Sequence, residues 1–143
     1  MNIKIVYATK TKNSKKIAER IGEKLKIEPK IIEKQPVMED VDLLFIVGGI
    51  YAGKCHPDIL EFASELEKGQ IKKVALITSC LSNNTKQDKV RELLEEKDVE
   101  IIDEFVCKGN FLFFGYGHPK EEEINASTEF AKKIVEGITD FIY

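Results

Sequence analysis

A turn made only of polar residues, TKTKNS at positions 9–14, lies between an apolar run and a helical pattern. It carries hydroxyl groups on Thr9, Thr11 and Ser14 and the side-chain amide of Asn13. The helix that begins near Ser14 also offers backbone N–H groups that have no partner within the helix. Hydroxyls, an amide and a helix start together form a nest for a phosphate group. The turn therefore predicts phosphate binding; the alternative is that Asn13 or Ser14 only caps the helix.

A second candidate site is GGIYAGKC, residues 48–55, which has the G-x-x-x-x-G-K spacing of a nucleotide-binding P-loop. Cysteine stands where that loop has the serine or threonine whose hydroxyl holds Mg²⁺. A thiol is a poor ligand for this hard cation, so P-loop-type nucleotide binding is the weaker alternative. Dinucleotide binding is disfavoured because the turn at residues 9–14 contains no glycine.

The elements that must position these residues alternate along the chain. Near-continuous apolar runs predict strands, and a weaker strand is expected after the first helix. The predicted strands are residues 3–8, 30–33, 43–49, 73–79 and 100–107. Apolar residues three or four apart predict helices that include residues 17–25, 59–66, 90–94 and 124–138. The alternation predicts a single α/β domain over residues 1–143, with a parallel sheet and right-handed crossovers. Five strands and four helices fit a flavodoxin-like three-layer sandwich with strand order 2-1-3-4-5.

Both candidate sites fall at one point of this fold. Ligands bind beyond the carboxyl ends of the strands where the strand order reverses, which here lies after the first and third strands. The turn at residues 9–14 follows the first strand, and the loop at residues 48–55 follows the third. We therefore expect the two segments to form one ligand site.

The residues at these positions resemble the flavodoxin family over essentially the whole chain. TKTKNS is similar to the family's FMN-phosphate loop, (S/T)-x-T-G-N-(S/T), with Lys12 where the family usually has glycine. VDLLFIVGGIYAGKCHPDILEF, residues 41–62, resembles the third strand, the flavin-contacting loop and the third helix. VALITSCLSNN, residues 74–84, occupies the place of the second flavin-contacting loop. The resemblance implies non-covalently bound FMN.

The FMN site that the resemblance implies has three parts. Residues 9–14 would bind the phosphate, and residues 50–53 and 79–81 would lie on either side of the isoalloxazine ring. Tyr51 is the candidate for a stacking ring, and Gly53 matches the peptide that turns over in flavodoxins when the flavin is reduced. No catalytic residue and no metal ligand are predicted. The predicted cofactor-binding residues are Thr9, Lys10, Thr11, Lys12, Asn13, Ser14, Ile50, Tyr51, Ala52, Gly53, Ser79, Cys80 and Leu81.

The function that follows is electron transfer by an FMN-binding, flavodoxin-like protein that serves redox partner proteins. The alternative is an FMN-dependent oxidoreductase of a small molecule, similar to flavodoxin-type protoporphyrinogen oxidases or to quinone reductases. Whether the protein is an enzyme is therefore left open. The Phe-rich segment at residues 108–123 either extends the fifth strand under the last helix or forms a loop on the flavin side. His118 in this segment and His56 are the side chains that titrate near neutrality.

Charge, apolar runs and cysteine content limit the classes of partner and the cellular location that we expect for this protein. A net charge of -3 gives no support for nucleic acid or a membrane surface as a partner. No apolar run approaches the roughly 18 residues of a membrane span, and the N-terminus has no signal-peptide pattern. Cys55, Cys80 and Cys107 are odd in number and far apart, which is typical of a reducing compartment. We expect a cytoplasmic protein.

Overall fold

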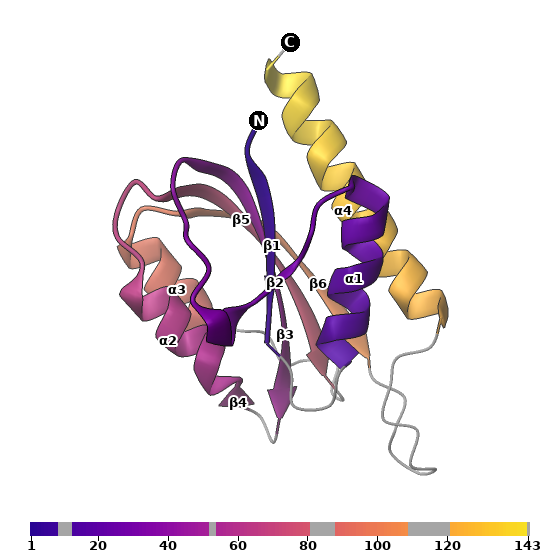
Figure 1. Ribbon diagram of the computed structural model, residues 1–143, viewed down its shortest axis with the longest axis horizontal. Helices are drawn as coiled ribbons and strands as arrows, with labels where there is room; N and C mark the ends of the chain where they lie inside the picture. The colour runs from indigo at the N-terminus through magenta and orange to yellow at the C-terminus, as the bar shows by residue number, and fades with distance from the viewer. Residues whose placement is uncertain (9–12, 52–53, 81–87, 109–120, 143) are drawn as a thin grey trace.

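A parallel sheet forms the centre of the computed structural model, which describes residues 1–8, 13–51, 54–80, 88–108 and 121–142 (Figure 1). Along its main path the order is β2-β1-β3-β5-β6, and each neighbouring pair is parallel. Counted along the chain, these strands have the order 2-1-3-4-5, which confirms the predicted fold class. The strands are β1 (Ile3–Tyr7), β2 (Lys30–Ile31), β3 (Val41–Tyr51), β5 (Ile71–Cys80) and β6 (Glu100–Lys108).

Helices cover both faces of this sheet (Figure 1). The buried residues of α1 and α4 belong to one apolar cluster, and those of α2 and α3 belong to a second cluster on the opposite face. This arrangement is the predicted three-layer sandwich. The helices in the described residues are α1 (Asn13–Leu25), the 3₁₀ helix η1 (Ile32–Lys34), α2 (Pro57–Glu65), α3 (Asp88–Glu96) and α4 (Glu121–Ile142). None of them is long and apolar enough to span a membrane.

The central strand β3 shows why the apolar runs are nearly continuous. Leu44 and Ile46 pack toward α2 and α3, whereas Leu43 and Phe45 pack toward α1 and α4. All four side chains are fully buried, because successive residues of a strand point to opposite faces and both faces are covered. The apolar pattern thus places β3 between two helical layers.

The connection from β2 to β3 differs from the sequence prediction. The expected strand at residues 30–33 ends at Ile31, and Ile32 begins η1 instead. Gln35 ends η1 in the left-handed conformation, with φ of 49°, and its N–H donates to the carbonyl of Ile32 at 2.8 Å. Residues 35–39, which we call the strap, then return to β3 without forming a helix or strand.

A short hairpin at the end of β3 is a second feature that the apolar pattern does not predict. Lys54 and Cys55 form β4, which pairs antiparallel with the last two residues of β3. α2 begins immediately afterwards at Pro57, as its first-turn proline predicts. β4 is two residues long, too short for a periodic pattern to reveal.

Candidate functional site

The carboxyl ends of β1, β3 and β5 meet at one edge of the sheet, the lower edge in Figure 1. The N–H of Ala8 donates to the carbonyl of Val47 at 3.1 Å, so β1 remains bonded to β3 up to its end. In β3 and β5, Gly49 is paired with Ser79. The starts of the two predicted flavin-contacting segments therefore lie side by side.

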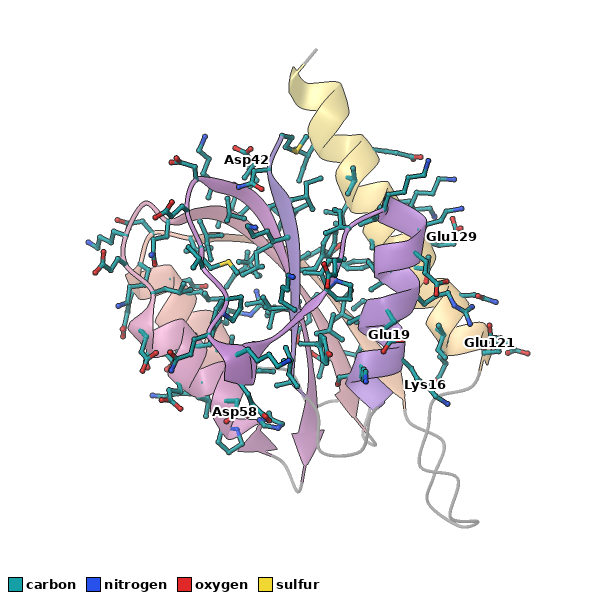
Figure 2. The ribbon with its side chains drawn as sticks, viewed as in Figure 1. Lys16, Glu19, Asp42, Asp58, Glu121 and Glu129 are labelled. Atoms are coloured by element: carbon teal, nitrogen blue, oxygen red, sulfur yellow. The ribbon has the colours of Figure 1, made fainter. Side chains whose placement is uncertain are left out.

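The start of α1 lies at the same edge. Ser14, in the first turn, is fully buried, and its hydroxyl oxygen has no hydrogen-bond partner among the described residues. The first turn contains no acidic residue and continues into Lys15 and Lys16. By contrast, α2, α3 and α4 each carry at least one acidic residue in the first turn. Figure 2 shows Lys16 near the start of α1 and Asp58 near the start of α2.

This helix start has the properties of a phosphate site. A buried hydroxyl without a partner costs about 1–3 kcal/mol, a cost that a hydrogen-bonding ligand would remove. The first N–H groups of a helix and its dipole favour an anion there, and no acid in the first turn of α1 competes for that position. The residues present therefore fit the phosphate group of a flavin nucleotide.

The predicted flavin-contacting loop after β3 begins in the hairpin of β3 and β4. Ile50 pairs with Cys55, and Tyr51 pairs with Lys54. A P-loop runs from its strand through a glycine-rich loop directly into a helix, with its lysine at the helix start. Here Lys54 belongs to a strand, and α2 begins later, at Pro57. This geometry disfavours the nucleotide-binding alternative.

The structure describes some of the predicted site residues and not others. Asn13 begins α1, and Ser79 and Cys80 end β5, so their backbones lie at the carboxyl edge of the sheet. His118 and most of the Phe-rich segment fall outside the described residues. The predicted cofactor-binding residues that also fall outside are Thr9, Lys10, Thr11, Lys12, Ala52, Gly53 and Leu81.

His56, which the sequence singled out as a titratable side chain, caps α2. Its Nδ1 accepts a hydrogen bond from the backbone N–H of Asp58 at 3.1 Å, and the side chain is almost completely buried. A structural role for His56 follows from this contact.

A buried ionic group supports the end of β5. Glu104, on β6, has a side chain only 3% exposed, and its two oxygens are bonded to different elements. Arg91 Nη2, from α3, lies 2.6 Å from Glu104 Oε1, and Thr78 Oγ1 donates to Oε2 at 3.0 Å. Thr78 immediately precedes Ser79, so this group holds the strand just before the predicted flavin-contacting segment. The sequence signal was an acid inside an apolar strand, because a buried carboxylate requires a partner.

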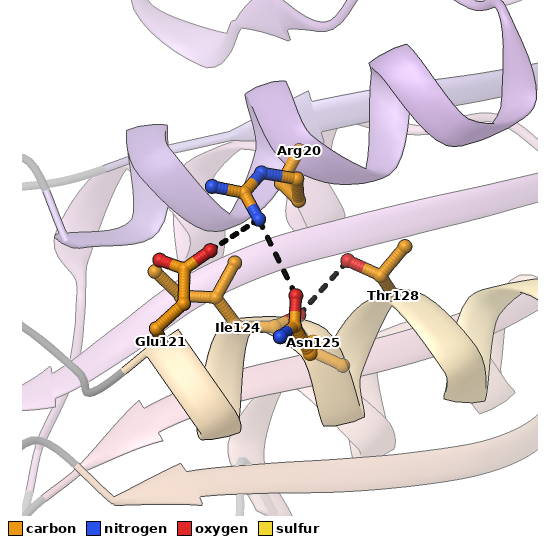
Figure 3. Close-up of polar contacts among 6 residues, drawn as sticks. Arg20, Glu121, Ile124, Asn125 and Thr128 are labelled. Atoms are coloured by element: carbon orange, nitrogen blue, oxygen red, sulfur yellow. Dashed lines mark hydrogen bonds and ion pairs between the residues drawn. The ribbon is translucent and has the colours of Figure 1, made fainter.

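A second polar contact joins α1 to α4 (Figure 3). Arg20 Nη1 donates to Glu121 Oε1 at 2.6 Å and to Asn125 Oδ1 at 3.3 Å. The hydrogen bond to Glu121 raises the pKa of the Arg20 guanidinium above its usual value. Both charged side chains are largely exposed, so the contact orients the two helices and contributes little to stability.

Another group with a shifted pKa, Asp42, lies far from this edge. The backbone N–H of Asn2 donates to Asp42 Oδ2 at 2.7 Å and lowers the pKa of that carboxyl. Asp42 lies at the opposite edge of the sheet (Figure 2). Within the described residues, no cluster of His, Cys, Asp and Glu could hold a metal ion.

Known proteins share this fold. A flavodoxin domain family matches residues 4–133. An uncharacterized protein of Methanocaldococcus jannaschii is 33% identical over 136 residues, which cover 87% of this chain and 91% of that protein.

Two solved structures illustrate the range of similar folds. The oxidised flavodoxin 2 of Bacillus cereus has 17% identity and a TM-score of 0.71, with 96% of this chain and 99% of that one covered. An NAD(P)H:quinone oxidoreductase of Methanothermobacter marburgensis has 10% identity and a TM-score of 0.58, with 93% and 96% covered. At these identities the similarity concerns the fold.

Proposed function

We propose that this chain, which belongs to the flavodoxin domain family, binds FMN and transfers electrons between redox partner proteins. Family membership points to a flavin cofactor. The observation that favours FMN over an uncharged flavin is the start of α1, where the buried Ser14 hydroxyl has no partner among the described residues. When bound, FMN supplies one- and two-electron redox chemistry. The chain's own residues bind and orient it.

In this proposal the phosphate is held by the first turn of α1. Ser14 Oγ and the backbone N–H groups of that turn would donate hydrogen bonds, together with the preceding residues 9–12. Bonds from such donors to a charged group contribute about 1.5–3 kcal/mol each. The phosphate therefore supplies a large part of the affinity for FMN.

In this proposal the flavin ring lies between the two segments at residues 50–53 and 79–81. The pairing of Gly49 with Ser79, which puts the starts of these segments next to each other, supports this arrangement. The group formed by Thr78, Glu104 and Arg91 fixes the end of β5 and so orients the second segment. Backbone donors and acceptors from these segments would match the polar edge of the ring.

A second candidate is an FMN-dependent oxidoreductase acting on a quinone or another small molecule, such as a protoporphyrinogen. The fold similarity to an NAD(P)H:quinone oxidoreductase supports this candidate. Both functions require the same FMN site and differ in whether a substrate is turned over.

The test begins with the apoprotein mixed with excess FMN and separated by gel filtration. We expect the protein peak to retain equimolar FMN with a flavin absorption spectrum; protein that elutes without FMN would contradict the proposal. The FMN-loaded protein is then incubated with NAD(P)H and a soluble quinone. A carrier should show no turnover, whereas sustained quinone reduction would establish the second candidate.

A further inference from the structure

The layer formed by α2 and α3 is incomplete over one side of the sheet. Parallel strands are usually joined by a helix that covers the sheet. Here the connection from β2 to β3 supplies only η1 and the strap, while α2 and α3 cover the sheet farther along. A place beside α2 that an α-helix commonly occupies therefore holds only η1 and the strap.

A hollow lies at this place, between the strap and α2. Its cavity volume is about 420 Å³. Val37 in the strap is 72% exposed, although large aliphatic side chains are usually buried. The apolar residues that line the hollow come from η1, the strap, α2 and the residue after α2; they are Ile32, Pro36, Val37, Met38, Phe62 and Leu66.

Among the residues that the structure describes, the charged side chains that line the hollow are all acidic, and no Lys or Arg lines it. Asp58 lies 3.8 Å from His56, and the other carboxylates of the hollow form no ion pair with a described residue. A hollow on the other side of the strap, by contrast, is lined by Lys4, Lys30 and Lys34 together with Glu28. The acidic residues of the first hollow are Glu33, Glu39, Asp58, Glu61 and Glu65.

We propose that this hollow, which we call the α2 groove, docks a cationic amphipathic helix of a partner protein. The apolar floor matches the apolar face of such a helix, and the carboxylates on both sides match lysine or arginine on its flanks. α2 is nine residues long, so a partner helix lying alongside it would contact it over about two and a half turns. The docked helix would complete the layer beside α2.

The α2 groove does not depend on the proposed FMN site, so its test uses the flavin-free protein. The probe is a fluorescein-labelled peptide of about 14 residues, long enough to form a helix on binding, with leucines at positions i, i+4, i+7 and i+11 and lysines elsewhere. We expect saturable binding by fluorescence anisotropy. Replacing the leucines by serine should abolish it, whereas equal binding of that peptide would show charge attraction alone and overturn the proposal.

Paired variants locate the binding site. Glu61→Lys with Glu65→Lys reverses two charges of the groove and should weaken the peptide at least tenfold, roughly the effect of removing close charge pairs. Glu92→Lys with Glu96→Lys makes the same charge change on α3 and should change affinity less than about twofold. Equal losses in both variants would overturn the proposal.

Two other occupants are distinguished in the same experiment. Spermine, a small polycation, should displace the peptide only at concentrations far above those of an unlabelled peptide; equally effective displacement would assign the groove to small cations. Sedimentation velocity tests whether a second copy of the chain covers it. Dimers that are lost in the Glu61→Lys, Glu65→Lys variant would replace the partner helix by a self-contact and overturn the proposal.

Discussion

The starts of α1 and α2 lie at the same edge of the sheet but differ in the charge and the polar contacts of their first turns. The start of α2 is capped within the protein, because His56 accepts a hydrogen bond from the backbone N–H of Asp58. The Asp58 side chain also puts a negative charge in the first turn. α1 has no acid in its first turn, and the hydroxyl of Ser14 is buried without a partner among the described residues. A helix start that is capped within the protein stabilises the fold, whereas the start of α1 binds an external anion in the function that we propose.

Asn13→Asp should produce the largest effect, because it puts an acid in the first turn of α1 as in the other helices. A carboxylate about 6 Å from a phosphate opposes its binding by roughly 3 kcal/mol per charge at an effective dielectric constant of 20. FMN should therefore bind at least about 100-fold more weakly. Riboflavin, which lacks the phosphate, should bind as before. Calorimetric titration with both ligands measures the difference.

The matched control makes the opposite change at α2. Asp58→Asn removes a negative charge from that first turn and should lower the free energy of unfolding by about 0.3–1 kcal/mol. The affinity for FMN should stay the same. If Asp58→Asn changed FMN binding as strongly as Asn13→Asp, the two helix starts would not differ in function.

Ser14→Ala should have the next largest effect. Loss of one hydrogen bond to a charged phosphate should weaken FMN by about 10- to 100-fold. The apoprotein should keep its stability or gain up to about 1 kcal/mol, because a buried hydroxyl without a partner is removed. Urea unfolding without ligand and FMN titration test the two effects separately. A destabilised apoprotein with unchanged FMN affinity would assign Ser14 to the fold alone.

His56→Ala should affect stability and leave phosphate recognition intact. Loss of an N-cap costs about 1 kcal/mol, and removal of a buried ring adds to that cost. His56→Asn restores a good capping side chain and should recover about 1 kcal/mol relative to His56→Ala in urea unfolding. Both variants should keep the same ratio of FMN to riboflavin affinity as the parent. A ratio that fell in His56→Ala would place the histidine in the ligand site.

Arg20→Gln should have the smallest effect. It removes a cation from α1 about 9 Å along the helix from Ser14, at 1.5 Å per residue. At that distance physiological salt screens most of the interaction, so FMN affinity should change less than about twofold. Titration in low and physiological salt measures this. A tenfold loss would mean that general positive charge on α1, and not its first turn, attracts the phosphate.

The sequence predicted the parts of the fold that depend on long apolar patterns. The apolar runs that form β3 and β5 are nearly continuous because both faces of these strands are covered by helices. Such runs can be recognised in the sequence alone. The predicted strand at residues 30–33 was wrong in its second half, since Ile32 begins η1. A pattern of four residues does not distinguish a strand from a 3₁₀ turn, and tertiary packing decides.

The candidate site was predictable in its residue types but not in its geometry. The polar turn before α1 pointed to Ser14, yet its burial without a partner depends on how α1 packs against the sheet. The capping role of His56 was also hidden, because histidine is not a typical N-cap residue. The α2 groove arises from the absence of an α-helix between β2 and β3. The hollow depends on how η1 and the strap pack beside α2, which a sequence pattern does not show.

The most direct test of the phosphate site compares FMN with riboflavin on the unmodified apoprotein. Quenching of flavin fluorescence gives both dissociation constants under the same conditions. Two or more hydrogen bonds to the phosphate, each contributing about 1.5–3 kcal/mol, predict that FMN binds at least about 100-fold more tightly. Equal affinities for the two ligands would contradict the assignment of α1 as an anion site.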